Sequence, residues 1–171
     1  GTFRVREVMQ SAWTRTSDQA ESTVVLGGQV SANVDFGNFR YGTIGGRKWN
    51  DLNGNTDTDP GEPSLAGWQI VMYEVNNPSI KDTVATDSTG WYWFTNLLSG
   101  TYHNIEVQQN GWIQTFPVTY EQQGYHLVGV TSGTYSEGNS FGNRQVGSIS
   151  GMKFNDLNSN GTKDESENGI Q

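Results

Sequence analysis

Two twelve-residue loops carry oxygen-bearing side chains at the spacing that wraps a calcium ion. The first runs over residues 51–62 and the second over residues 156–167, 105 residues further along the chain. Oxygen ligands at positions one, three, five, nine and twelve, with the main-chain carbonyl at position seven, form the set that one short segment offers to Ca²⁺. The predicted ligands are Asp51, Asn53, Asn55, the Asp57 carbonyl, Asp59 and Glu62 in the first loop, and Asp156, Asn158, Asn160, the Thr162 carbonyl, Asp164 and Glu167 in the second.

The two loops differ at the sixth position, where the chain must turn sharply. The second loop has Gly161 there and satisfies the full pattern, whereas the first has Thr56. The alternative interpretation is a solvated turn without an ion, because Asn, Asp and Gly dominate turns in general. A turn does not require carboxylates at the ninth and twelfth positions of both loops, so the pattern favours the ion. Extracellular modules bind calcium at roughly 10⁻⁴–10⁻³ M, and millimolar calcium would add about 1–2 kcal/mol per site. We therefore expect a structural role.

The loops are part of a longer internal repeat. Three further pairs of segments match, namely 1–8 with 100–107, 36–38 with 141–143, and 42–51 with 147–156. Self-similarity at a fixed period is the signature of a tandem array. We expect the C-terminal half of one repeat at 1–41, a complete repeat at 42–146, and the N-terminal start of a third at 147–171.

The composition excludes several classes of function. The chain has no cysteine and a formal net charge of −8, and nucleic-acid binding needs clustered Lys and Arg, so we expect no nucleic-acid partner. No apolar run approaches the roughly 20 residues of a membrane span. His103 and His126 lack a paired Ser or Asp pattern, so neither a zinc site nor an enzyme is predicted.

Short segments rich in aromatic and β-branched residues predict an all-β fold. They lie at 68–75, 91–94, 101–107, 125–130 and in the run into Phe141, with Asn, Gly and Pro turn signals between them. About seven short strands in one repeat indicate a two-sheet antiparallel β-sandwich of immunoglobulin-like architecture. Nothing reads as a helix, and Pro60 and Pro63 would break the exit helix of an EF-hand.

Four motifs in fixed order resemble the B-type repeat domains of bacterial surface adhesins, of the serine–aspartate-repeat B type and the collagen-adhesin B type. They are Lys-Trp-Asn-Asp-Leu-Asn-Gly-Asn at 48–55, Gly-Glu-Pro-Ser-Leu-Ala-Gly-Trp at 61–68, Thr-Asp-Ser-Thr-Gly-Trp-Tyr-Trp-Phe-Thr-Asn-Leu at 86–97, and Gly-Thr-Tyr-His-Asn-Ile-Glu at 100–106. The resemblance implies a prealbumin-like (transthyretin-like) sandwich, a tandem arrangement, and calcium in the loop between the first two strands. It also implies a location at the cell surface or in an extracellular filament, where such repeats commonly form a stalk.

Strand alternation points to a second chemistry. It places Glu106 and Asn143 on apolar faces and puts Lys48 on the same face as Ile44. Buried lone charges are costly, so these groups should meet. The resemblance to the collagen-adhesin B type implies an isopeptide bond between Lys48 and Asn143, with Glu106 as its catalyst. The alternative is a Lys48–Glu106 ion pair, with Asn143 capping the final turn. The equivalent residues in the incomplete repeats are Glu7, Asn38 and Lys153, so one set can close within the chain.

The function that these observations predict is a calcium-stabilised stalk or filament segment of a prokaryotic extracellular surface protein. Its partners would be neighbouring repeats of the same chain or fibre. The alternative is a carbohydrate- or protein-binding adhesive module, because six Trp and seven Tyr residues could form a glycan-stacking surface. Trp91 and Trp93 share one strand face and are the candidates for that surface.

Overall fold

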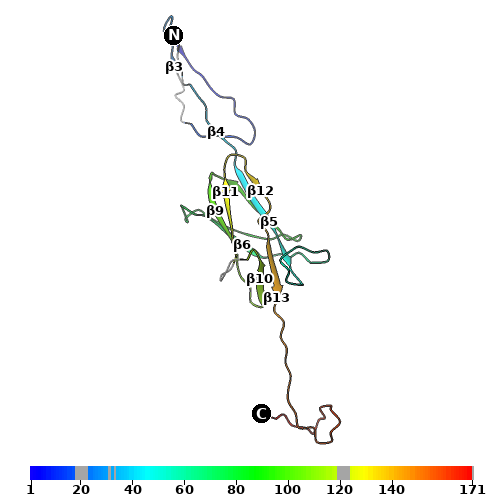
Figure 1. Cartoon of the computed structure of the whole chain (residues 1–171). Coiled ribbons are helices and arrows are strands. Elements are labelled where there is room, and N and C mark those ends of the chain that lie inside the picture. Colours follow the sequence, from blue (N-terminus) through cyan, green and yellow to red (C-terminus); the bar gives the residue numbers. More distant parts are fainter. Residues whose placement is uncertain (18–22, 31, 33, 119–123, 171) are drawn as a thin grey trace.

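The computed structural model describes residues 1–17, 23–30, 32, 34–118 and 124–170. Figure 1 shows a central β-sandwich, a strand-containing segment before it and an extended segment after it. The prediction of an all-β fold is confirmed, and the described residues contain no helix. Among them, therefore, no helix is long and apolar enough to cross a membrane.

The central sandwich consists of two sheets built from nine strands. In the first, β5 has β8 on one edge and both β13 and β12 on the other, and β10 lies outside β13. The second has the order β11-β9-β6-β7. The first sheet contains β5 (Gly42–Asn50), β8 (Trp91–Leu97), β10 (Trp112–Phe116), β12 (Tyr135–Ser136) and β13 (Phe141–Gln145), and the second contains β6 (Gln69–Glu74), β7 (Lys81–Ala85), β9 (Gly100–Glu106) and β11 (His126–Val130).

The core forms where the inward faces of the two sheets meet. Tyr92 and Phe94 alternate along β8, Ile70 and Met72 alternate along β6, and all four are almost fully buried. This period of two is what the sequence of these strands dictates. The sequence did not locate strands β7 and β10. For β7 the reason is that it lies at a sheet edge and that its five residues, Lys-Asp-Thr-Val-Ala, carry little apolar pattern.

Two strand pairings depart from the antiparallel sandwich that the sequence predicts. The first strand of the domain, β5, runs parallel to its last strands, β12 and β13. All other strand pairs in the sandwich are antiparallel. A parallel pair needs a long connection, and here the rest of the domain supplies it. The chain consequently enters at one end of the sandwich through β5 and leaves at the other through β13 (Figure 1).

The segment before the sandwich contains two short antiparallel pairs. Strand β1 (Thr2–Phe3) pairs with β3 (Thr23–Val24), and β2 (Thr14–Arg15) pairs with β4 (Asn38–Phe39). Both pairs keep the register of their counterparts in the sandwich, since Thr2↔Val24 corresponds to Thr101↔Gly129 and Arg15↔Asn38 to Gln114↔Asn143.

The segment after the sandwich does not pack against it. Residues 144–153 are all exposed. A bridge between Phe154 and Gly169 then closes the second predicted calcium loop on itself.

Candidate functional site

Lys48, Glu106 and Asn143 meet inside the sandwich. Lys48 lies on β5 and Asn143 on β13, and the parallel pairing of these strands sets Lys48 opposite Phe141, two residues before Asn143. Glu106 reaches the same point from the end of β9 in the facing sheet. The exposed fractions of Lys48 and Asn143 are 0%, and that of Glu106 is 2%. The arrangement therefore excludes bulk water.

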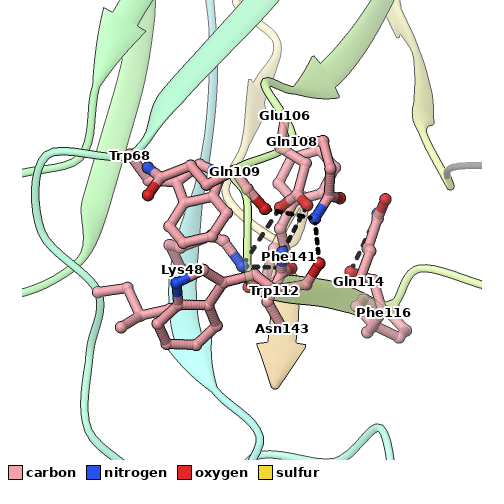
Figure 2. Close-up of polar contacts among 12 residues, drawn as sticks. Lys48, Trp68, Glu106, Gln108, Gln109, Trp112, Gln114, Phe116, Phe141 and Asn143 are labelled. Carbon is pink, nitrogen blue, oxygen red and sulfur yellow. Dashed lines mark hydrogen bonds and ion pairs between the residues drawn. The ribbon is translucent and has the colours of Figure 1, made fainter. Parts of the chain in front are cut away.

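The three side chains form a closed ring of contacts (Figure 2). Lys48 Nζ donates to Asn143 Oδ1 at 2.5 Å and lies 3.2 Å from Glu106 Oε2. Asn143 Nδ2 donates to Glu106 Oε1 at 2.7 Å. The carboxyl group of Glu106 thus touches both the Lys48 amine and the nitrogen that Asn143 would release if its amide were exchanged.

Aromatic rings enclose the ammonium end of Lys48. Its Nζ lies 4.4 Å from the ring centroid of Trp68, and Trp112 packs edge-on against Trp68 at 5.4 Å between centroids. The carbonyl oxygen of Phe141 accepts a further hydrogen bond from Nζ at 3.2 Å. The sequence did not indicate that Trp68 contacts the lysine, because Trp68 lies on a different segment with no periodic relation to β5.

Burial shifts both titratable groups of the ring toward their neutral forms. Desolvation lowers the pKa of Lys48 to about 8, although Glu106 opposes that shift. Desolvation likewise raises the pKa of Glu106, against the influence of Lys48 and of the Asn143 hydrogen bond. Burial disfavours charged forms in this way in general. The ring therefore presents an amine and a carboxylic acid more readily than surface groups would.

The alternative interpretation of the sequence has the Asn143 side chain capping the final turn, and the structure does not place it there. Asn143 lies within β13, where its backbone pairs with Gln114 and with Asn50. Its side chain instead joins the lysine to the glutamate. The chemistry that this arrangement can perform is attack by the Lys48 amine on the carboxamide carbon of Asn143, beside a carboxyl group placed to move protons.

The two predicted calcium loops share most of their internal hydrogen bonds. In the first, Glu62 accepts from the amides of Leu52 and Asp59, and Asp51 accepts from the amide of Thr56. In the second, Glu167 accepts from Leu157 and Asp164, and Asp156 accepts from Gly161. The sixth residues share one backbone conformation, with φ of 75° at both Thr56 and Gly161. Two different sequences therefore build one loop geometry.

The ninth residue of each loop collects the side-chain amides. Asn53 and Asn55 both donate to Asp59 Oδ2 at 2.8 Å, and Asn158 and Asn160 donate to Asp164 Oδ2 at 2.7 and 2.9 Å. Asp51 is fully buried. Burial alone would raise the pKa of Asp51, but the hydrogen bonds from Thr56, Gly54 and Asn55 outweigh it, and its pKa lies below the usual value.

The oxygen donors of the loops are of the type that calcium prefers, but they do not point toward a common centre. Hard oxygen donors from the predicted side chains gather around each loop, as Ca²⁺ requires. Among the described residues, however, no three His, Cys, Asp or Glu side chains come together in a group that could hold a metal ion. The carboxylates of Asp51 and Glu62 are engaged by backbone amides instead.

The aromatic candidates lie on the outer face of the first sheet. Trp91 and Trp93 stack at 5.5 Å with an angle of 6° between their planes, and Tyr135 stacks on Trp93 at 5.5 Å. Each of these rings thus has one face covered by a neighbouring ring. His126 hydrogen-bonds the carbonyl oxygen of Ser140 and packs against Phe141, and burial lowers its pKa. These contacts make it part of the packed core.

Comparison with known proteins identifies the central domain. Residues 42–126 match the family model described as SdrD B-like domain. The chain is 29% identical over 176 residues to the serine-aspartate repeat-containing protein D of Staphylococcus aureus strain Newman, and 28% identical over 164 residues to the serine-aspartate repeat-containing protein F of Staphylococcus epidermidis strain ATCC 12228. These matches cover 90% and 91% of the chain but only 12% and 10% of the relatives.

Solved structures with a related arrangement include two pilins. The minor pilin GBS52 of Streptococcus agalactiae has a TM-score of 0.45 and 18% identity, covering 75% of this chain and 60% of that one. The major pilin subunit BcpA of Bacillus cereus has a TM-score of 0.45 and 20% identity, covering 68% and 32%.

Fold and site together define a β-sandwich repeat domain of the kind found in surface adhesins. Residues 42–126 are similar to the SdrD B-like domain family. The chain spans about an eighth of the length of the curated relatives it matches.

Proposed function

We propose that the central domain is a stalk segment of an extracellular surface protein, locked by an isopeptide bond between Lys48 and Asn143. Two features support the stalk. The domain is similar to a family of repeat domains, and the parallel pairing of β5 with β13 sends the chain in at one end and out at the other. Domains of this construction can be joined in a line without folding back.

The observation that carries the bond is the buried ring of Lys48, Glu106 and Asn143. The neutral Lys48 amine attacks Cγ of Asn143, and Glu106 Oε2 takes the proton that the amine loses. Glu106 Oε1 then delivers a proton to Nδ2, which leaves as ammonia. One C–N bond forms and one breaks, so the balance requires no oxidant or further reactant. Burial contributes by keeping the amine neutral and the carboxyl protonated more readily than in water.

The intact mass of the 171-residue chain tests this proposal. We expect a deficit of one ammonia, and tandem mass spectrometry should find the peptides of Lys48 and Asn143 joined. Asn143→Ala should restore the full mass. Asn104→Ala is the matched control, because Asn104 is equally buried on β9 but is not part of the ring that Lys48, Glu106 and Asn143 form. A full unmodified mass in the folded wild-type chain would leave only the ion-pair alternative.

Calcium in the two loops is the second part of the proposal. What supports it is that loops of different sequence share most of their hydrogen bonds and the same left-handed sixth residue. When bound, calcium would be held by Asp51, Asn53, Asn55, the Asp57 carbonyl, Asp59 and Glu62, and by the equivalent set from Asp156 to Glu167. The ion would supply charge neutralisation and rigidity, since the carboxylates repel one another without it.

Thermal unfolding with calcium and with chelator tests the loops. We expect millimolar calcium, but not the same concentration of magnesium, to raise the free energy of unfolding by about 1–2 kcal/mol. Asp59→Ala should abolish the gain. Asp82→Ala, on the exposed edge strand β7, should preserve it. An equal response to magnesium and calcium would assign the effect to general screening instead.

An adhesive module remains the alternative function, supported by the stacked outer-face rings of Trp91, Trp93 and Tyr135. Tyr135 is 64% exposed and could receive a sugar ring. A glycan array probed with the chain and with Tyr135→Ala separates the readings. Specific binding lost in the variant would favour the adhesive module over the stalk.

A further inference from the structure

The chain contains four asparagine–glycine pairs, at 53–54, 110–111, 160–161 and 168–169. In such a pair the glycine amide nitrogen can attack Cγ of the asparagine side chain, because glycine has no Cβ to obstruct the approach and its backbone is mobile. Ammonia leaves, and water opens the resulting ring to aspartate or isoaspartate. The surroundings of each glycine nitrogen therefore decide which asparagine reacts.

Two of the pairs lie in the predicted calcium loops, where a carboxylate holds the attacking nitrogen. The amide of Gly54 donates to Asp51 Oδ1 at 2.7 Å, and the amide of Gly161 donates to Asp156 Oδ2 at 2.8 Å. The nitrogen must lose its proton in order to attack, and a neighbouring carboxylate disfavours the anion that forms. The hydrogen bond must also break, and bonds to charged acceptors are among the stronger ones. The first aspartate of each loop thus protects an asparagine of that loop.

The pair Asn110-Gly111 has no such protection. Both residues are exposed in the turn between β9 and β10. Among the residues that the structure describes, neither the Asn110 side chain nor the Gly111 amide makes a hydrogen bond, whereas the Gly111 carbonyl oxygen accepts one from Val146. Nothing lies within 4 Å of the position that a Cβ on Gly111 would take. The attacking nitrogen is therefore open to reaction.

The fourth pair, Asn168-Gly169, is held by backbone pairing instead of by a carboxylate. Gly169 forms an isolated bridge with Phe154, and the carbonyl oxygen of Asn168 accepts from the amide of Asn155 at 3.0 Å. Within the described part of the sandwich and its loop, Asn53 is therefore the protected residue and Asn110 the open one.

We propose that Asn110 is a site of spontaneous deamidation, and that Asp51 and Asp156 protect Asn53 and Asn160 from the same reaction. The Gly111 nitrogen bonds to Cγ of Asn110, the Cγ–Nδ2 bond breaks, and Nδ2 leaves as ammonia with the proton that the nitrogen gave up. Water then adds to one of the two carbonyl carbons of the ring and opens it. The net change is one ammonia lost and one water gained, and neither the isopeptide bond nor calcium is needed.

The position of Asn110 gives the modification a structural effect. The bond from the Val146 amide to the Gly111 carbonyl oxygen, at 2.9 Å, continues the pairing of β10 with β13. Trp112, the first residue of β10, packs edge-on against Trp68, which covers Lys48. Isoaspartate adds a carbon to the backbone of the turn. It should therefore weaken the bond from Val146 and loosen this end of the β10–β13 pair.

Peptide mapping of the folded chain after incubation at mildly alkaline pH tests the proposal. Chelator is present, so that the hydrogen bonds alone provide the protection. We expect aspartate and isoaspartate to accumulate at Asn110 at least about tenfold faster than at Asn53 or Asn160. In denaturing urea the protecting bonds are lost, and the rates at these positions should converge. Equal rates at all of them in the folded chain would overturn the proposal.

A variant of the second loop tests the protecting carboxylate without disturbing the sandwich. Asp156→Ala should speed the deamidation of Asn160 by at least about tenfold and leave the rates at Asn53 and Asn110 unchanged. Asp156→Asn, which keeps an acceptor but removes the charge, should give a rate between those of Asp156→Ala and the wild type. Glu165→Ala is the matched control, because Glu165 is an exposed carboxylate of the same loop that accepts no hydrogen bond among the described residues. An unchanged rate at Asn160 in Asp156→Ala would rule out the protecting role.

Hydrogen exchange of the Val146 amide measures the structural effect. We expect exchange to become faster as isoaspartate accumulates, and to stay slow in freshly prepared Asn110→Asp, which adds the charge without lengthening the backbone. Exchange that does not respond to isoaspartate would contradict the effect on β10. The intact mass keeps the proposed function separate, because the isopeptide bond loses an ammonia without gaining a water.

Discussion

At the scale of single residues, the central feature is a buried lysine at a position where an apolar side chain would cost less free energy to bury. Lys48 has no exposed surface and meets a carboxyl group that is also buried. Replacing such a pair by apolar residues is often neutral or stabilising, so packing alone does not explain it. The bond that we propose would consume the charge on the amine.

The buried amine predicts a pH dependence that is visible once the bond is prevented. In Asn143→Ala the free Lys48 keeps its lowered pKa, about 8 in the intact ring, whereas the unfolded chain titrates near its ordinary value. Between these values the unfolded state binds more protons, so stability rises with pH. We therefore compare the free energies of unfolding of Asn143→Ala and of the double variant Lys48→Met/Asn143→Ala by chemical denaturation. The difference between them should narrow between about pH 8 and pH 10.5, by on the order of 1–3 kcal/mol. A constant difference across this window would show that Lys48 is not buried as a free amine.

A second prediction concerns the sixth residue of the first loop. Thr56 adopts φ of 75°, a left-handed conformation that strains a β-branched residue, and Gly161 adopts the same angle without that cost. Thr56→Gly should raise the free energy of unfolding by about 1 kcal/mol. Thr58→Gly, nearby and outside the left-handed region, should give no gain or a small loss. The opposite order in urea denaturation would contradict the strain argument.

At the scale of elements, the sequence predicts what is periodic and misses what depends on contact between distant strands. The alternation along β6 and β8 predicts their buried faces, and the same strand alternation predicts that Lys48, Glu106 and Asn143 turn inward. The parallel pairing of β5 with β13 does not follow from either strand alone, because register between segments about 95 residues apart is set by the whole fold. The same holds for the ring of Trp68 over Lys48.

The close approach of β5 to its neighbours gives a test at this scale. A Cβ on Gly46 would lie 2.1 Å from the carbonyl oxygen of Asn139, which is backbone and cannot move aside alone. Gly46→Ala should therefore lower the free energy of unfolding by at least about 1–3 kcal/mol. Gly129→Ala, on β11 with nothing within 4 Å of the added carbon, should be nearly neutral. Equal effects in thermal unfolding would mean that β5 is not held as closely as the structure has it.

At the scale of the molecule, the position of the Lys48–Asn143 pair determines how the domain carries load. The two residues belong to the strands by which the chain enters and leaves the sandwich. Tension applied to a tandem chain acts on these strands first. A bond between them would pass the force from β5 to β13 and leave the rest of the sandwich unloaded.

Single-molecule stretching with handles on the two termini measures this directly. The bond would close off the stretch between Lys48 and Asn143, which are 95 positions apart in the sequence. At about 3.3–3.6 Å per residue, unfolding of that stretch would lengthen the chain by roughly 310–340 Å. We expect this step to be absent in the wild-type chain, because the covalent link bypasses the stretch, and present in Asn143→Ala. Glu106→Gln should behave like Asn143→Ala, since it keeps the hydrogen bond to Asn143 but cannot take the proton from the lysine. A full-length step in the wild type would show that the buried ring is a noncovalent clasp, and the stiffness of the stalk would then have to come from packing and from the loops.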